Sequence, residues 1–234
     1  MNELLLLAFI LCDLFIALLL LRFFGKIGAI LFYILNVIMS QIIVKMQIDI
    51  FGFTMILGSA LFSMLFLATD IITEHYGKKE AYTAIKLGTI ALLFFLFVIK
   101  ISTLFVPSGT NTIFDSFNAL FSGQWRIIFA DIVISYFVFQ MFNVWLFNKI
   151  KQLTKNKHIW LRTNVAAWTC NILVAILFFQ AAFAGVLPQN ILWQLILVGL
   201  VVKLFIVVLE TPVIYLSYKF LPKNELNKKR AAAR

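Results

Sequence analysis

Long apolar stretches occupy most of this chain and restrict its fold more than any other feature. A helix that spans a lipid bilayer needs about 20 mainly apolar residues. Seven stretches meet this requirement, each bounded to within a few residues: Leu4–Leu21, Ile27–Val44, Phe53–Ile72, Tyr82–Phe105, Arg126–Phe147, Arg162–Phe183 and Ile191–Leu221. Hydrophobic residues make up 63% of the chain and charged residues only 13%, so a soluble globule of this size would expose too much apolar surface. We therefore predict an all-α, polytopic transmembrane helix bundle of about seven spans, with a six-span core and an extra N-terminal span.

The basic residues predict how these spans are oriented. If the N-terminus lies outside, 16 of the 20 lysines and arginines fall in inner segments, and Lys45, Lys100 and Arg126 fall outside. Cytoplasmic loops of membrane proteins are enriched in lysine and arginine, so the pattern predicts an N-out, C-in arrangement. It also explains the net charge of +10 without direct contact with nucleic acid. We expect one membrane domain, residues 1–221, and a basic cytoplasmic tail, residues 222–234.

Ionisable residues within apolar stretches are candidate functional residues, because a charge at the centre of a bilayer costs at least about 2.5–3.5 kcal/mol. Asp70 and Glu74 lie four residues apart and share one helix face. Gly77 follows, and we expect it to end that helix. Two interpretations stay open. Either the helix ends at the inner interface with its carboxylates neutralised by the next lysines, or the two carboxylates face a polar cavity as hydrogen-bond acceptors.

The last apolar stretch contains Lys203 and Glu210, which lie about 10 Å apart along one helix face. That separation is too long for a direct ion pair, so each side chain needs water, a ligand or a partner on another helix. Asp70 is a candidate partner for Lys203. Structural pairing and a role in substrate or proton handling both explain why these two residues are present.

Amides form a third group of candidates. Gln140 and Asn143 share a helix face, as do Asn164 and Asn171. Such amides either join helices to one another or bind a polar ligand. No metalloprotease, serine-hydrolase or phosphate-binding motif is present in the sequence. The sequence therefore does not favour an enzyme or an ATP-driven pump, and no cofactor or metal is expected.

The segment FLATDIITEHYGKKEA, residues 66–81, gives the chain a resemblance to a known family. Weaker matches follow in order: Ser135-Tyr136 with Gln140 and Val144–Phe147; Leu161-Arg162 with Asn164; and Lys203 with Glu210-Thr211-Pro212 and Tyr215-Leu216. Over roughly residues 25–221 the chain resembles the queuosine precursor transporters, also described as a vitamin uptake transporter family. The resemblance implies a small multi-pass protein of the bacterial inner membrane that imports 7-deazaguanine precursors of queuosine, such as preQ0, preQ1 or queuine.

The chain departs from the family's pattern at several positions. Family members tend to have Asp at the positions of Asn143 and Glu210, and the sixth span lacks a family carboxylate, because Val174 and Ala175 stand where the family has Asp-Thr. These departures point to a different precursor, such as queuine, rather than to a different fold. The candidate substrate-binding residues are Asp70, Glu74, Gln140, Asn143, Arg162, Asn171, Lys203 and Glu210.

Three other functions remain as alternatives. The chain is either a transporter by itself or a substrate-binding membrane subunit for another vitamin-like molecule that needs an energising partner. A membrane-embedded enzyme is disfavoured by the missing motifs, and a purely structural protein by Lys203 and Glu210. The expected partners are a small planar nucleobase-like substrate and the lipid bilayer, and the sequence leaves a homo-oligomer open.

Overall fold

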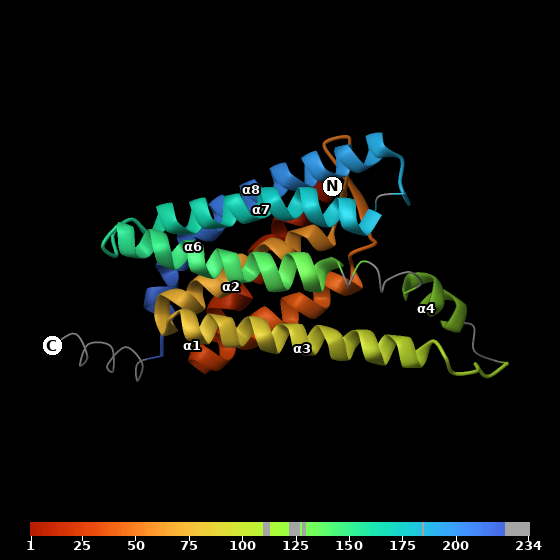
Figure 1. Ribbon diagram of the computed structural model, residues 1–234, viewed down its shortest axis with the longest axis horizontal. Coiled ribbons are helices and arrows are strands. Elements are labelled where there is room, and N and C mark those ends of the chain that lie inside the picture. The colour runs from red at the N-terminus through yellow and green to blue at the C-terminus, as the bar shows by residue number, and fades with distance from the viewer. Residues whose placement is uncertain (110–112, 122–126, 128–129, 184, 223–234) are drawn as a thin grey trace.

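The computed structural model describes residues 1–109, 113–121, 127, 130–183 and 185–222. Arg126 and the predicted basic tail beyond residue 222 lie outside the described residues. The described elements are α1 (Asn2–Ile42), β1 (Gln47–Ile50), β2 (Phe53–Ile56), α2 (Gly58–Tyr76), α3 (Lys78–Ser102), α4 (Ile113–Phe121), the π-helix η1 (Asp131–Phe139), α6 (Gln140–Leu153), α7 (Ile159–Phe183) and α8 (Gln189–Phe220). Figure 1 shows that the long helices run side by side in a bundle, which confirms the predicted helical architecture.

The helix α1 consists of two antiparallel halves that meet at Gly25, whose φ of 56° and ψ of −129° are not helical. Asn36 donates a hydrogen bond of 3.4 Å to the Asp13 carboxylate. In a straight helix these residues would lie about 34 Å apart, so the chain reverses direction between them. The crossing is tight, because a Cβ on Gly28 would lie 1.9 Å from the Leu20 carbonyl oxygen. The two halves correspond to the first two predicted spans.

The third predicted span, Phe53–Ile72, is wrong at its first residues. These residues form β2, which pairs antiparallel with β1. Phe51 and Gly52 make the turn with φ values of 51° and 81°, and two consecutive residues of positive φ match the tight turns of two-residue hairpins. Glu3 accepts a hydrogen bond from the Phe51 N–H, which, with a weaker contribution from the N-terminal ammonium, lowers the pKa of Glu3 to about 2. The hairpin therefore packs beside the N-terminus, and we call this end of the bundle the hairpin end.

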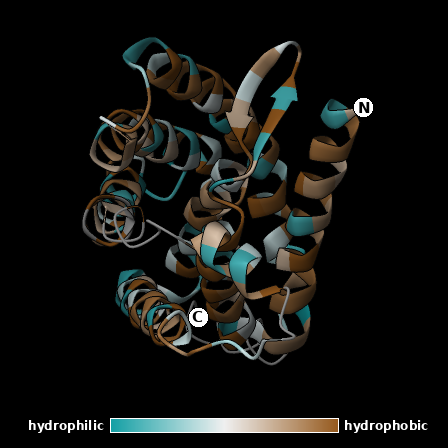
Figure 2. Ribbon diagram, turned by 90° about the vertical axis from the view of Figure 1, so that its right-hand side faces the viewer, coloured by the Kyte–Doolittle hydropathy of each residue, from teal (hydrophilic) through white to brown (hydrophobic). Residues whose placement is uncertain are grey.

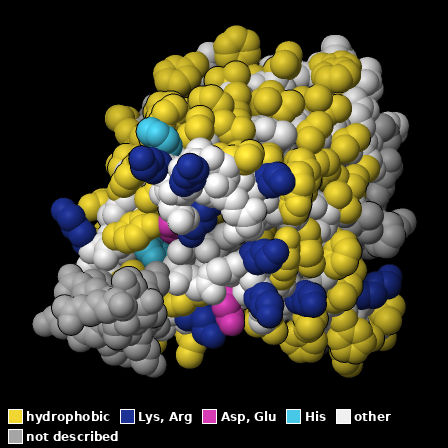
Figure 3. Space-filling view, turned by 60° about the vertical axis from the view of Figure 1, so that its left-hand side comes forward, with side chains coloured by type: hydrophobic (Ala, Val, Ile, Leu, Met, Phe, Trp, Pro, Cys, Tyr) yellow, Lys and Arg dark blue, Asp and Glu magenta, His cyan; other side chains and the backbone are white. Residues whose placement is uncertain are grey.

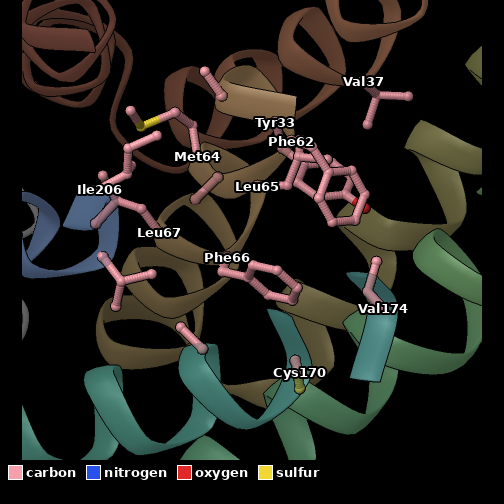
Figure 4. Close-up of a cluster of buried hydrophobic side chains, with 14 of the residues drawn as sticks. Tyr33, Val37, Phe62, Met64, Leu65, Phe66, Leu67, Cys170, Val174 and Ile206 are labelled. Carbon is pink, nitrogen blue, oxygen red and sulfur yellow. The ribbon is translucent and has the colours of Figure 1, made fainter. Parts of the chain in front are cut away.

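The helix α2 lies at the centre of the bundle, where 17 of its 19 residues are buried. Figure 4 shows Phe62, Leu65 and Phe66 of α2 among side chains from other helices, including Val37 of α1 and Val174 of α7. Gly77, with φ of 91°, ends α2 as predicted and begins α3. Because α2 is enclosed by protein, it can carry more polar residues than a helix that faces lipid.

The outer surface of the bundle is apolar. Figure 2 shows that hydrophobic residues make up most of the long helices, and many large hydrophobic side chains of α1, α3, α7 and α8 are exposed. Four described helices, α1, α3, α7 and α8, are long and apolar enough to cross a membrane. α3, α7 and α8 match the fourth, sixth and seventh predicted spans to within a few residues, and α8 continues through Pro212. The number of spans and their orientation stay predictions.

Contacts between distant segments bring the predicted inner loops to one end of the bundle. Lys26 forms an ion pair of 3.2 Å with Glu80, and Arg22 donates to the carbonyl of Leu221 at the end of α8. Figure 3 shows lysine and arginine side chains spread over this end of the molecule. We call it the basic end. An alternating arrangement of spans requires this clustering, because it places every second loop on the same side.

Candidate functional site

Polar side chains form a stripe along α2 from the hairpin end to the basic end. Ser59, Ser63, Asp70 and Glu74 lie four, seven and four residues apart, which keeps them within about 60° of one another around the helix. All four are buried or nearly so. Each contacts a different set of residues on the surrounding elements, and those sets have different chemistry.

Glu74 lies at the basic end, where cations of the protein neutralise its charge. Its carboxylate forms ion pairs of 2.8 Å with Arg162 and 3.1 Å with Lys151, and the Tyr218 hydroxyl donates to it. We call these four residues the Glu74 cluster. Burial alone raises the pKa of Glu74, but the Tyr218 hydrogen bond and the two cationic neighbours outweigh it and hold the pKa below its usual value. Glu74 is therefore charged at neutral pH.

The Glu74 cluster connects α2, α6, α7 and α8 at one point. Arg162 is only 1% exposed, and its guanidinium also lies 5.4 Å from the centre of the Phe147 ring. His75 of α2, one residue further on, lies 2.7 Å from the Ser217 hydroxyl of α8. The carboxylate is neutralised from α6 and α7, not by the lysines that follow it in sequence, which corrects the first of the two interpretations given above.

Asp70 lies one turn deeper, in an arrangement made mainly of neutral groups. Asn143 donates a hydrogen bond of 2.9 Å to Asp70 Oδ1, and the Thr69 hydroxyl donates one of 3.3 Å to Gln140 Oε1. Asp70, Gln140, Asn143 and Asn171 all have a relative exposure that rounds to zero. Asn171 follows Cys170, which lies close enough to Asp70 for the two side chains to interact electrostatically. We call these four residues the Asp70 set.

Every member of the Asp70 set has a hydrogen-bonding atom to spare. Among the described residues, no partner is found for Asp70 Oδ2, Asn143 Oδ1, Gln140 Nε2 and both amide atoms of Asn171. Buried polar atoms are nearly always paired, so each exception needs an explanation. Here the unpaired atoms include both acceptors and donors. Such a set is able to bind a polar ligand whose edge carries both N–H donors and a carbonyl acceptor.

Lys203 lies closer to the hairpin end. Its ammonium is 4.8 Å from the centre of the Phe62 ring, and it lines a cavity with Ser40, Gln41 and Ser59. The cavity measures about 20 Å³, room for about one water molecule. The sequence suggested Asp70 as a partner for Lys203, and this prediction is wrong: among the described residues Asp70 has no ion pair, and Asn143 donates to it.

Glu210 of α8 lies apart from the Asp70 set and accepts a hydrogen bond of 3.4 Å from Ser63. It is fully buried and close enough to Asp13 of α1 for the two carboxylates to repel one another. The predicted candidate residues therefore divide into four places. Asp70, Gln140 and Asn143 lie together, with Asn171 next to Cys170, which interacts with Asp70. Glu74 is paired with Arg162, and Glu210 and Lys203 lie separately.

Several residues of these groups were missed from the sequence. Lys151 and Tyr218 complete the Glu74 cluster, Thr69 joins Gln140, and Asn36 binds Asp13. Thr69 was the easiest to find, because it precedes Asp70 on the same helix. Lys151 was not singled out, because it belongs to a run of basic residues that is typical of a solvated loop.

Comparisons with known proteins identify the family. A family model described as "Putative vitamin uptake transporter" matches residues 56–217. The chain belongs to the vitamin uptake transporter family. The chain is also 25% identical, over 212 residues, to a Bacillus subtilis (strain 168) protein described as "Probable queuosine precursor transporter", a match that covers 90% of this chain and 92% of that protein. No solved structure matches the chain.

Family membership settles the class of protein. It is a multi-pass membrane transporter, in agreement with the apolar helices, and the resemblance seen in residues 66–81 is confirmed. The family match begins in β2 and ends near the end of α8. It therefore includes the whole polar stripe of α2 and the two other elements, α6 and α7, that contribute to the Asp70 set.

Proposed function

We propose that this vitamin uptake transporter imports a 7-deazaguanine precursor of queuosine, one of preQ0, preQ1 or queuine, across the bacterial inner membrane. The Asp70 set carries the proposal, because its unpaired atoms are both acceptors and donors. The name of the Bacillus subtilis relative supports the choice of substrate class.

The hydrogen-bonding edge of a deazaguanine complements the Asp70 set. The base presents two adjacent N–H donors, which a carboxylate such as that of Asp70 accepts, and a carbonyl oxygen, which an amide NH₂ group donates to. The unpaired Nδ2 of Asn171 and Nε2 of Gln140 are such donors. Phe66, buried on the same helix and facing α7, offers a ring against which a planar base can pack (Figure 4).

Glu74 and Arg162 hold a different role in this proposal. They neutralise one another within the Glu74 cluster and close the basic end beneath the Asp70 set. The cavity near Lys203 holds about one water, much less than a bicyclic base. Asp70 itself is fully buried, so the substrate reaches it only when helices separate, as expected of a transporter that alternates access to a central site.

The test is the queuosine content of tRNA. A host that neither synthesises nor imports queuosine precursors, but is able to use them, would express this chain and receive preQ0, preQ1 or queuine at low concentration. We expect queuosine to be restored by at least one precursor, and the precursor that acts at the lowest concentration is the substrate. No restoration with any of the three, despite membrane expression, contradicts the proposal.

Reconstitution separates a complete transporter from a subunit that needs an energising partner. Purified protein in liposomes is loaded with unlabelled precursor and diluted into labelled precursor. Exchange of label into the liposomes shows that the chain transports alone. Binding without exchange favours a substrate-binding subunit.

A further inference from the structure

A second polar group, buried except for the half-buried Asp13, lies between the Lys203 cavity and the Asp70 set. It consists of Asp13 and Asn36 from the two halves of α1, Ser63 from α2 and Glu210 from α8. Asn36 Nδ2 donates 3.4 Å to Asp13 Oδ1, and Ser63 Oγ donates 3.4 Å to Glu210 Oε1. The two carboxylates interact electrostatically with one another, so the two hydrogen-bonded pairs form one group. We call it the Asp13–Glu210 pair.

The charged groups around the pair do not neutralise it. From α2, Asp70 is near enough to repel Glu210, and Lys203 lies about two turns away along α8, with its ammonium over the Phe62 ring. Within the described part of the chain, neither Asp13 nor Glu210 forms an ion pair with a lysine, arginine or histidine. Two carboxylates that repel one another in a mostly buried place are unlike other paired charges, because they do not both stay ionised without a cation.

The unpaired atoms of the pair indicate that the neutralising cation is a proton. Within the described residues, Asp13 Oδ2, Asn36 Oδ1 and Glu210 Oε2 lack a hydrogen-bond partner. Asn36 is only 3% exposed, so its amide oxygen is an independent sign of something missing. All three atoms are acceptors, and no unpaired donor accompanies them. A proton on one carboxylate oxygen turns that acceptor into a donor, which supplies what the group lacks.

We propose that the Asp13–Glu210 pair binds the proton that drives transport. This rests on the proposed transport function and adds the coupling ion to it. One proton from the more acidic side occupies a carboxylate of the pair and leaves to the other side after the helices rearrange. The repulsion between Glu210 and Asp70 links proton occupancy to the state of Asp70, where the substrate is proposed to bind.

The test compares two kinds of transport in liposomes that contain the purified full chain and labelled queuine. Exchange of internal unlabelled for external labelled queuine needs substrate binding but no driving force. Accumulation driven by a pH gradient needs a coupled proton. At zero membrane potential, a gradient of one pH unit, acidic outside, gives up to about tenfold accumulation of a substrate that crosses with one proton.

The decisive variant is Asp13→Asn, because Asp13 is no part of the proposed substrate site. We expect it to exchange queuine as the wild type does but to lose nearly all accumulation driven by the pH gradient. Glu210→Gln should also abolish that accumulation. The matched control is Asp115→Asn, which changes an exposed carboxylate of α4 and should keep both activities.

Three outcomes in which exchange is retained overturn the inference. They are a wild type that exchanges queuine but ignores the pH gradient, an Asp13→Asn variant that still accumulates queuine, and accumulation that follows a sodium gradient instead. Loss of exchange in a monodisperse Asp13→Asn variant also overturns it, because the pair would then belong to the substrate site. A wild type that exchanges none of preQ0, preQ1 and queuine contradicts the proposed function instead.

Discussion

The Glu74 cluster and the Asp70 set lie one helical turn apart on α2, yet ion pairs satisfy the first carboxylate and a neutral amide the second. The Glu74 carboxylate contacts Arg162, Lys151 and Tyr218. In the Asp70 set, every residue has an atom with no partner among the described residues. Glu74 Oε2 and Arg162 Nε and Nη1 also make no hydrogen bond among the described residues, but ion pairs within the protein neutralise their charges. The unpaired atoms of the Asp70 set have no such compensation, and spare hydrogen-bonding capacity in a buried place costs stability. The comparison therefore assigns structure to the first region and ligand binding to the second.

The largest expected effect on stability comes from breaking the Glu74 cluster. Glu74→Gln leaves Arg162 buried without its carboxylate, and removing one partner of a buried ion pair costs about 3–5 kcal/mol. We expect a large fall in the thermal unfolding temperature of the purified protein in detergent. The matched control is Glu80→Gln, which removes the more exposed ion pair with Lys26 and should cost about 0–1 kcal/mol. A similar loss of stability in Glu74→Gln and Glu80→Gln would contradict the structural role assigned to the Glu74 cluster.

Two asparagines on α7 give a sharper test, because they differ only in their pairing. Asn171 has no partner for either amide atom among the described residues, so Asn171→Leu should leave stability unchanged or raise it. The same change should weaken queuine binding by about 1–3 kcal/mol, because the ligand carbonyl loses the Nδ2 donor and is left buried without it. Equilibrium binding and thermal unfolding measured on the same sample check both effects.

The matched variant is Asn164→Leu. Asn164 donates hydrogen bonds of 2.7 Å to the Trp160 carbonyl and to the Thr211 hydroxyl. Its loss should lower stability by about 1 kcal/mol or more and leave queuine affinity as it is. If Asn171→Leu is the more destabilising of the two, the unpaired amide has a structural role and its assignment to the ligand is wrong.

The smallest expected effect is that of Gln140→Met. Gln140 Oε1 accepts from the Thr69 hydroxyl, which also donates toward the carbonyls of Leu65 and Phe66, so Thr69 keeps a partner in the variant. The lost Nε2 donor should reduce queuine affinity by about 0.5–1.5 kcal/mol, roughly two- to tenfold. Binding as tight as that of the wild type would place Gln140 outside the site.

Much of the architecture was predictable because it depends on local composition. Apolar stretches of spanning length predicted α3, α7 and α8, and the basic residues predicted which loops share an end. The β1–β2 hairpin was missed, because Phe53–Ile56 is as apolar as the helix that follows it. The two positive-φ residues of its turn are Phe51 and Gly52, and only the glycine gives a sequence signal.

The site was predictable as a set of residues but not as a set of contacts. An ionisable or amide group in an apolar stretch is costly, and that rule alone selected Asp70, Glu74, Asn143 and Asn171. It did not say which of them pair. Asn143 and Asp70, which are hydrogen-bonded, are 73 residues apart in the sequence, and Ser63 and Glu210 are 147 residues apart. No local sequence pattern predicts contacts between residues so far apart.

Equilibrium binding of labelled queuine to the purified wild type and to Asp70→Asn tests the central claim most directly. Asparagine keeps the shape of the side chain and an oxygen for Asn143 to donate to, but it removes the carboxylate that is proposed to accept the N–H groups of the base. We predict saturable binding that weakens by about 1.5–3 kcal/mol in the variant, the range for hydrogen bonds to a charged group, with unchanged thermal stability. Equal affinity in the two proteins would contradict the account.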